Sequence, residues 1–282
     1  MRSFSFKMLV LVLISMAFLS AVAQEREIQI ARLFKGVDGC FLITKVDNTE
    51  QYYYNKPQCL QVYSPCSTFK IANSLIALQT GVATGADFVI KWDSIRNPKE
   101  PWMAEKLPFK YWMQDHTLET AFKNSVVWYY QELARRIGET KMEELINRIA
   151  YGNNDISSGI DKFWLCGSMK VSAKEQVRFL RQFYNNKITG IEEKHIQTVK
   201  GIMLYETGDN YKLYGKTGGG RCSEEGVIGW YIGFIECEKG AYAFAMNMKA
   251  KSFAAFDNNR RIEVTKEILK ELGCIKLEET LN

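Results

Sequence analysis

The order of strand-like and helix-like segments constrains the fold of this chain more than any other feature. β-forming residues dominate four segments, one near the start and three near the end: 40–46, 211–217, 227–236 and 241–248. Apolar residues at helical spacing mark five further segments, all but the last lying between those strands: 67–79, 128–137, 139–150, 171–185 and 262–272. This order predicts an α+β protein, with one antiparallel sheet built from both chain ends, flanked by helices, and with a helical insertion in the middle.

Shorter patterns refine this arrangement. The segment 52–54 is expected to pair as a hairpin with the first strand. Ser172 is expected to cap the helix 171–185, because Glu175 follows it three residues later in a capping-box pattern. The segment 87–115 is rich in aromatic residues and proline and is expected to be irregular.

Composition and charge exclude several classes of protein. The 282 residues are 46% hydrophobic and 24% charged, which is typical of a globular chain and excludes a disordered one. Thirty-seven basic and 32 acidic residues give a net charge of +5. Two of the basic residues, Arg2 and Lys7, lie in a segment that is expected to be removed, and the small remaining excess does not indicate nucleic-acid binding.

Residues 1–23 have the pattern of a secretory signal peptide. A positively charged start is followed by the apolar segment 8–19 and then by Ala21-Val22-Ala23, the small-x-small pattern of a signal-peptidase site. The apolar run is shorter than the roughly 18–20 residues that a membrane-spanning helix needs, so no stable membrane anchor is expected. The mature domain would span 24–282 and be periplasmic or secreted after cleavage near Ala23.

The cysteines and histidines give little support to a metal site. Seven cysteines are present, and no two of them form a C-x-x-C pair. Only His116 and His195 are available as histidine ligands, so no metal is predicted. An oxidising compartment permits disulfides, but the odd number of cysteines leaves at least one thiol unpaired within the chain and the connectivity undetermined.

Ser67-Thr68-Phe69-Lys70 is the central chemical motif. Positions i and i+3 lie on one face of a helix, so Ser67 and Lys70 are expected to point the same way in its first turn. A serine hydroxyl is a weak nucleophile until a base removes its proton, and lysine can act as that base when burial lowers its pKa. The tetrad alone is common by chance, because a helix cap followed by a solvated lysine has the same pattern.

Two further elements make the pattern specific. Lys216-Thr217-Gly218 ends a strand-like segment, where a cation and a hydroxyl suit a carboxylate. Ser125, in Ser125-Val126-Val127, lies between two helical segments, where its hydroxyl can relay a proton. The order S-x-x-K, S-x-V, K-T-G is far more specific than any of the three motifs alone.

With these motifs the sequence resembles the class D, or oxacillinase-type, serine β-lactamases of the penicillin-recognising group. The resemblance covers nearly the whole mature chain and is carried by seven stretches: Ser64-Pro65-Cys66-Ser67-Thr68-Phe69-Lys70, Lys91-Trp92-Asp93, Ala121-Phe122, Ser125-Val126-Val127-Trp128-Tyr129-Tyr130, Tyr151-Gly152-Asn153, Phe163-Trp164-Leu165 and Lys216-Thr217-Gly218. It implies the fold of penicillin-recognising serine transferases and hydrolases. It also implies hydrolysis of the β-lactam ring of penicillin-type antibiotics through an acyl-serine, which gives antibiotic resistance.

The resemblance also implies roles for the reacting groups. Ser67 would be the acylated nucleophile, and Lys70 would carry carbon dioxide as a carbamate that acts as the general base. No other cofactor is implied. Trp164 would hold that carbamate through its indole N–H. Ser125, assisted by Lys216, would pass a proton to the leaving β-lactam nitrogen.

The implied substrate site has apolar, backbone and charged parts. It comprises six residues: Val127, Leu165, Thr217, Gly218, Gly219 and Arg261. The backbone N–H groups of Ser67 and Gly219 would form the oxyanion hole. Thr217 and Arg261 would bind the substrate carboxylate, although Arg260 lies beside Arg261 and the choice between them stays open. The implied partner is a small β-lactam molecule, and the oligomeric state is undetermined.

Two alternative functions and one disulfide hypothesis accompany this interpretation. A β-lactam sensor domain shares the Ser67, Lys70 and Trp164 positions and acylates without turnover. A D,D-peptidase usually has an S-x-N middle motif, which this chain lacks. Cys66, Cys166 and Cys222 are expected to lie around the site, with Cys66 bridged to one of the other two.

Overall fold

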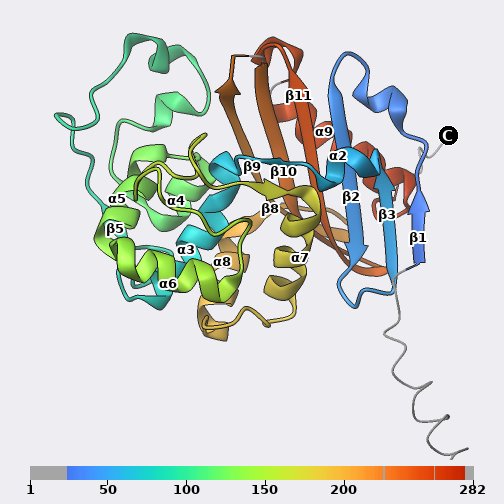
Figure 1. Cartoon of the computed structure of the whole chain (residues 1–282), viewed down its shortest axis with the longest axis horizontal. Helices are drawn as coiled ribbons and strands as arrows, with labels where there is room; N and C mark the ends of the chain where they lie inside the picture. Colours follow the sequence, from blue (N-terminus) through green and yellow to red (C-terminus); the bar gives the residue numbers. More distant parts are fainter. Residues whose placement is uncertain (1–23, 225, 257, 277–282) are drawn as a thin grey trace, which may run out of the picture.

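The computed structural model describes residues 24–224, 226–256 and 258–276, so the expected signal peptide 1–23 lies outside the described residues. A seven-stranded sheet forms the centre of the described chain, in the order β1-β3-β2-β11-β10-β9-β8 (Figure 1). Its strands are β1 (Gln24–Glu27), β2 (Asp38–Lys45), β3 (Glu50–Tyr54), β8 (Leu204–Thr207), β9 (Tyr211–Ser223), β10 (Gly226–Cys237) and β11 (Gly240–Ala250).

Both chain ends contribute to this sheet, as the sequence predicts. β2 pairs antiparallel with β11, where Cys40 faces Asn247, and β3 pairs with β2 as the expected hairpin. The α+β prediction is therefore confirmed. The expectation of a purely antiparallel sheet is wrong in one detail, because β1 pairs parallel with β3 and makes the sheet mixed.

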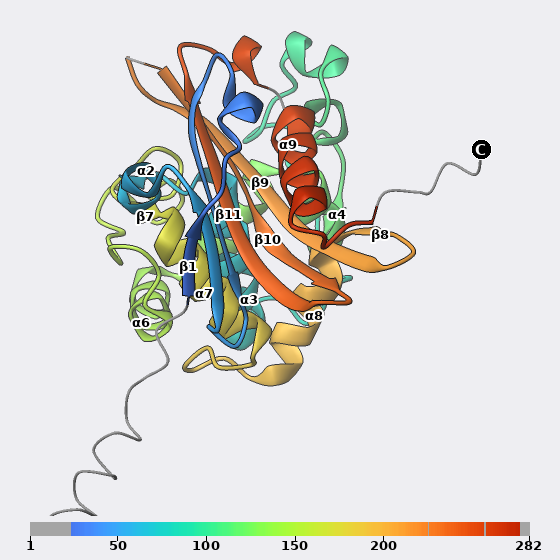
Figure 2. The ribbon, with the colours of Figure 1, turned by 90° about the vertical axis from the view of Figure 1, so that its right-hand side faces the viewer.

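Helices cover both faces of the sheet. The described α-helices are α2 (Lys56–Leu60), α3 (Lys70–Gln79), α4 (Leu118–Lys123), α5 (Val127–Ile137), α6 (Glu139–Ile149), α7 (Ala173–Tyr184), α8 (Glu193–Met203) and α9 (Asn258–Glu271). Figure 2 shows α9 on one face of the sheet and the helices of the middle of the chain on the other. No helix in the described part of the chain is long and apolar enough to cross a membrane.

Two apolar cores follow from the alternation of side chains along the strands. On the face of α9, Phe41, Phe244 and Tyr231 pack against Ile268 of that helix. On the opposite face, Leu42 and Trp230 belong to the larger core formed with the helical insertion. Neighbouring positions on one strand therefore contribute to different cores, and the second core is the one that surrounds the site described below.

Most of the predicted helices are present, with small differences in their bounds. Ser172 and Glu175 form the expected capping box in front of α7. The predicted helix 67–79 begins as a 3-10 turn, η2 (Cys66–Phe69), and becomes α-helical only at Lys70. The sequence patterns did not indicate α2, α4, α8, β1 or β8, which are short or lack a clear periodic signal.

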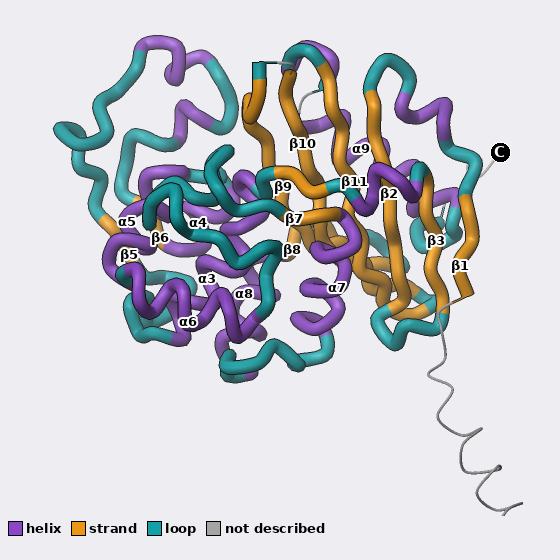
Figure 3. Tube along the Cα trace, in the orientation of Figure 1, coloured by secondary structure: helices purple, strands orange, loops and turns teal. Residues whose placement is uncertain are grey.

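The segment 87–115 is largely irregular, as expected (Figure 3). It contains the short strand β5 (Val89–Ile90), which pairs with β6 (His116–Thr117), and two 3-10 turns, η3 (Pro101–Glu105) and η4 (Phe109–Tyr111). A second two-stranded sheet joins β4 (Val62–Tyr63) to β7 (Val171–Ser172). Two further 3-10 turns are η1 (Ala31–Phe34) and η5 (Phe253–Ala255).

Candidate active site

Ser67 and Lys70 face each other at the junction of η2 and α3. In a 3-10 turn, residues i and i+3 lie directly above one another, so the local geometry itself brings the two side chains together. Lys70 Nζ lies 2.8 Å from Ser67 Oγ. Ser67 is half-buried and Lys70 is wholly buried, so the hydroxyl is reachable while the amine is not.

Burial controls the protonation of Lys70. Removal from water disfavours the ammonium form and lowers the pKa of Lys70 from 10.5 to about 7. Within the described residues no carboxylate offsets this effect, and the Tyr130 ring lies 5.2 Å from Nζ. A substantial fraction of this amine is therefore neutral at neutral pH, as a proton acceptor for Ser67 requires.

A second hydroxyl–lysine pair lies on the other side of the site. Ser125 occupies the turn between α4 and α5 with a positive φ of 54°, and Lys216 lies on β9. Lys216 Nζ donates to Ser125 Oγ at 3.0 Å and to the Thr217 carbonyl at 2.9 Å. Burial, followed by the positive charges of Lys70 and Arg261, lowers the pKa of Lys216 well below its ordinary value. This pair is suited to carrying a proton between a hydroxyl and a departing group.

Trp164 has an indole N–H without a hydrogen-bond partner among the described residues, although its side chain is wholly buried. A buried donor left unpaired costs about 1–3 kcal/mol, so its presence requires an explanation. The Phe69 ring stacks on the indole at 5.4 Å, which places Trp164 beside the turn that carries Ser67 and Lys70. An anionic group on Lys70 would fit this donor.

Ser64 holds the loop of Trp164 against the nucleophile turn, a role that the sequence did not assign. Its Oγ donates to the Trp164 carbonyl at 2.8 Å and accepts from the Cys166 N–H at 2.9 Å. The Ser64 carbonyl in turn accepts from the Trp230 indole at 3.0 Å. The sequence signal was limited to a serine directly before Pro65, close to the Ser67–Lys70 motif.

The strand β9 approaches η2 closely because its central residues lack side chains. A Cβ atom on Gly218 would lie 2.9 Å from the Pro65 carbonyl oxygen and 3.0 Å from Thr68, closer than real contacts allow. The expectation that the strand ends at Lys216-Thr217-Gly218 is wrong. β9 continues to Ser223, because Gly218, Gly219 and Gly220 stay paired with β10.

The structure separates the two neighbouring arginines of α9. Arg261 is buried and its Nη1 donates to the Gly218 carbonyl, and a Cβ atom on Gly219 would lie 3.0 Å from the same nitrogen. Arg260 instead donates to the carbonyls of Ala255 and Lys35. Arg261 is therefore the arginine that reaches the strand of the K-T-G motif.

The remaining substrate-site candidates lie on three different elements. Thr217 is half-buried on β9, Val127 begins α5 half-buried, and Leu165 packs at the edge of the larger core. Of the two valines in Ser125-Val126-Val127, Val126 is wholly buried and Val127 is half-buried. Side chains that keep some exposure can line a site that is open to a ligand.

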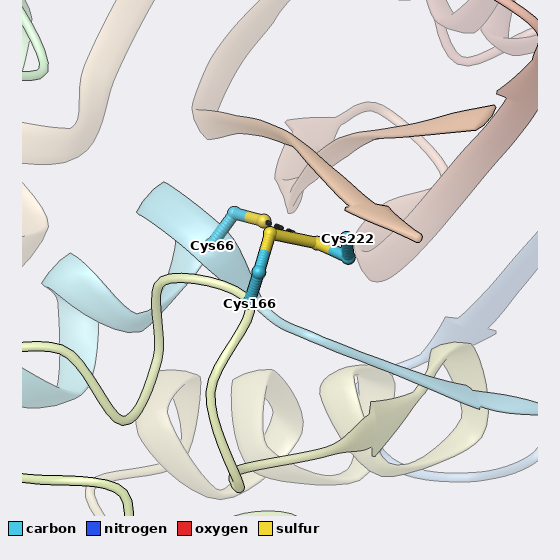
Figure 4. Close-up of side chains that lie close together, drawn as sticks. All are labelled: Cys66, Cys166 and Cys222. Atoms are coloured by element: carbon cyan, nitrogen blue, oxygen red, sulfur yellow. Dashed lines mark hydrogen bonds between the residues drawn. A yellow bond between two sulfur atoms is a disulfide. The ribbon is translucent and has the colours of Figure 1, made fainter. Parts of the chain in front are cut away.

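The cysteine hypothesis is wrong in its pairing. Cys166 and Cys222 form the disulfide, and Cys66 remains a free thiol, although its Sγ lies 3.9 Å from Cys222 Sγ (Figure 4). The three cysteines do converge, as expected. Which two cysteines form the disulfide depends on how the loop after Trp164 packs against the end of β9. The spacing of the cysteines along the chain does not reveal this packing.

Comparison with known proteins places this site in a family. Residues 41–272 match the penicillin binding protein transpeptidase domain family. Beta-lactamase OXA-48 of Klebsiella pneumoniae is 39% identical over 226 residues, which are 80% of this chain and 80% of that protein. The methicillin resistance mecR1 protein of Staphylococcus aureus is 33% identical over 249 residues, which are 88% of this chain but 40% of that protein.

Solved structures agree with the sequence matches. The crystal structure of a class D beta-lactamase from Sebaldella termitidis has a TM-score of 0.81 at 31% identity, covering 90% of this chain and 99% of that one. The similarity therefore extends over most of this chain and nearly all of that one. The chain belongs to the class D serine β-lactamases of the penicillin-binding transpeptidase family.

Proposed function

We propose that this protein hydrolyses the β-lactam ring of penicillin-type antibiotics through an acyl-serine, and thereby gives antibiotic resistance. The observation that carries the proposal is the 2.8 Å contact between Ser67 Oγ and Lys70 Nζ, whose amine is wholly buried and has its pKa lowered to about 7. A charged, solvated lysine at the same place could not take the serine proton.

Each residue of the site has a part in the proposed reaction. Lys70 accepts the proton of Ser67 as the hydroxyl attacks the lactam carbonyl. The backbone N–H groups of Ser67 and Gly219 donate to the developing oxyanion. Ser125, assisted by Lys216 at 3.0 Å, passes a proton to the leaving nitrogen.

The substrate carboxylate is bound by Thr217 and Arg261. A guanidinium forms strong charge-assisted hydrogen bonds with a carboxylate, and the Gly218 carbonyl holds Arg261 beside β9. Gly218 has no side chain to block close approach of the substrate to this strand. Val127 and Leu165 supply apolar surface at the mouth of the site.

The residues around Lys70 fit a carbamate formed with carbon dioxide. Carbamate formation needs a neutral amine, which burial provides, and the unpaired Trp164 indole N–H offers a donor for the new anion. When bound, the group supplies a carboxylate-type oxygen as the base for acylation and deacylation. Trp164 would hold that charge in place, and the buried surroundings would shield the group from bulk water.

We also propose that the mature protein works in the periplasm or outside the cell. The charged and apolar pattern of residues 1–23 supports this location. Amino-terminal sequencing of the protein from fractionated cells should find Gln24 as the first residue. A first residue of Met1 in the soluble fraction would contradict it.

Turnover of a chromogenic cephalosporin tests the proposed function. Many product molecules for each protein molecule are expected, whereas a single equivalent followed by arrest would favour a β-lactam sensor. Lys70→Ala should lower turnover by at least about 100-fold, the usual contribution of a general base. Lys123→Ala is the matched control, because that lysine is exposed and pairs only with Glu119 among the described residues.

A further inference from the structure

Three sulfur atoms from distant parts of the chain converge next to the nucleophile turn (Figure 4). Cys66 lies in η2, Cys166 in the loop between α6 and β7, and Cys222 near the end of β9. Their Sγ atoms all lie within 4.8 Å of one another, although 156 residues separate Cys66 from Cys222. This convergence agrees with the expectation from the sequence, because each of the three cysteines adjoins a different motif of the site.

The spacing of the sulfurs is close to that of a thiolate metal site. With Zn–S bonds of about 2.3 Å, two sulfur ligands of a tetrahedral ion lie about 3.8 Å apart. Cys66 Sγ already lies 3.9 Å from Cys222 Sγ. Opening the Cys166–Cys222 bond would free both of these sulfurs to turn about their Cα–Cβ bonds.

Gly220 leaves room for such an ion. A Cβ atom at this position would lie 2.7 Å from Cys166 Sγ, 3.0 Å from Cys66 Sγ and 3.3 Å from Cys222 Sγ. Any side chain at position 220 would therefore occupy the space next to the three sulfur atoms. The absence of a side chain at 220 is an observation independent of the cysteines themselves.

The cluster is enclosed on one side and open on the other. Cys66 is buried, with 1% of its surface exposed, whereas Cys166 and Cys222 are half-buried. An ion can therefore reach the sulfurs of Cys166 and Cys222 from solvent.

We propose that Cys66, Cys166 and Cys222 form a redox-gated site for one thiophilic metal ion, such as Zn²⁺ or Cd²⁺. A dithiol reductant gives two electrons and two protons to the Cys166–Cys222 disulfide and becomes a disulfide itself. The ion then replaces the three thiol protons, which are released to solvent. With the disulfide closed, only one thiolate ligand remains and the ion does not bind.

Occupancy of this site should arrest the neighbouring nucleophile. Cys66 directly precedes Ser67, so coordination of its sulfur constrains the backbone whose N–H faces the acyl group. This consequence rests on the proposed β-lactam reaction, whereas ion binding itself does not. Ion binding and the arrest of Ser67 can fail independently, so each is measured in its own experiment.

Cadmium titration of the full mature protein tests the site. The protein is reduced with a phosphine, which does not compete as a thiol ligand, and thiolate-to-cadmium charge-transfer absorption is compared with that of the untreated protein. The reduced protein should bind one more Cd²⁺ per chain than the untreated one. Equal binding in the two states, or a disulfide that the phosphine cannot open in the folded protein, would overturn the proposal.

Variants identify the ligands. Reduced Cys66→Ala should bind the additional ion more than about tenfold more weakly, as expected for loss of one ligand of three. Cys40→Ala, which removes another buried free thiol, should keep it. Gly220→Ala retains all three cysteines but fills the space between them, and should also lose the ion. Undiminished binding by both Cys66→Ala and Gly220→Ala would refute the site.

Labelling with a fluorescent penicillin measures the consequence for Ser67. Cd²⁺ should slow labelling of the reduced protein at least about tenfold and leave the untreated protein unaffected. If no labelling occurs even without Cd²⁺, the proposed β-lactam reaction fails while the ion-binding result stands. If Cd²⁺ binds and labelling is unchanged, the arrest is refuted.

Discussion

Lys216 Nζ donates a hydrogen bond to Ser125 Oγ at 3.0 Å, although the two residues are 91 positions apart in the chain. Lys216 is held on β9, between β10 and the edge strand β8, and Ser125 occupies a tight turn of the helical insertion. The proton route of the proposed reaction therefore crosses the boundary between the two parts of the molecule. It depends on their packing as much as on either residue.

Removing the Ser125 hydroxyl should slow acylation by about 10²–10⁴-fold, the usual contribution of a positioned proton donor. Ser125→Gly is the suitable variant, because the positive φ of 54° costs glycine nothing. Stopped-flow measurement of acylation with a chromogenic cephalosporin checks it. Asn48→Gly, at another position with positive φ, is the control and should react at the wild-type rate.

The pH dependence of kcat/KM should show a rising limb near pH 7. The proposed carbamate forms only from the neutral Lys70 amine, whose pKa is lowered by burial to about 7, so activity rises as pH increases through that value. Rates are measured at constant dissolved carbon dioxide, so that the supply of the reactant does not change with pH. A profile that is flat from pH 5 to pH 8 would show that another group is the base.

Trp164→Phe should weaken the response to bicarbonate. The substitution keeps an aromatic ring against Phe69 but removes the unpaired indole N–H, which is the proposed donor to a carbamate. Loss of one hydrogen bond to a charged group, about 1.5–3 kcal/mol, should raise the bicarbonate concentration for half-maximal activity roughly 10–100-fold. Saturating bicarbonate should restore much of the rate, whereas a merely structural role would leave the bicarbonate dependence unchanged.

Arg261→Ala should raise KM for penicillins far more than Arg260→Ala does. Arg261 contacts the Gly218 carbonyl on β9, whereas the contacts of Arg260 within the described part of the chain include the carbonyls of Ala255 and Lys35. A lost charge-assisted hydrogen bond of about 1.5–3 kcal/mol corresponds to a fall of roughly 10–100-fold in kcat/KM. Steady-state kinetics of the two single variants compares them, and equal effects would contradict the assignment of the carboxylate to Arg261.

Lys70→Met should stabilise the protein while abolishing turnover. The pKa of Lys70 is lowered in the folded state, to about 7 from 10.5, so the unfolded chain binds more protons between these values. Stability therefore rises with pH across that window in the wild type, and the gain from Lys70→Met is largest at its acidic end. Each unit of lowering corresponds to roughly 1.4 kcal/mol, which is measurable as a rise in Tm.

Melting curves in carbon-dioxide-free buffer at several pH values check this expectation. Lys212→Met, at an exposed position of β9, is the control and should leave Tm nearly constant. A lower Tm for Lys70→Met across the whole range would mean that the lysine stabilises the fold rather than serving the reaction.

The sequence by itself determined the local parts of this protein. The spacing of three between Ser67 and Lys70 sets their contact within one turn, so this contact was predictable. The order of strands and helices likewise fixed the α+β class. The parallel pairing of β1 and the continuation of β9 through three glycines were not predictable, because partners across a sheet leave no periodic signal in one strand.

Only the tertiary structure decided the long-range choices. It placed Arg261 against the Gly218 carbonyl of β9, paired Cys166 with Cys222 rather than with Cys66, and left the Trp164 indole N–H without a partner among the described residues. The physical reason is that burial and charge act through space. A lowered lysine pKa or a buried unpaired donor arises only when segments far apart in the chain exclude water from the same place.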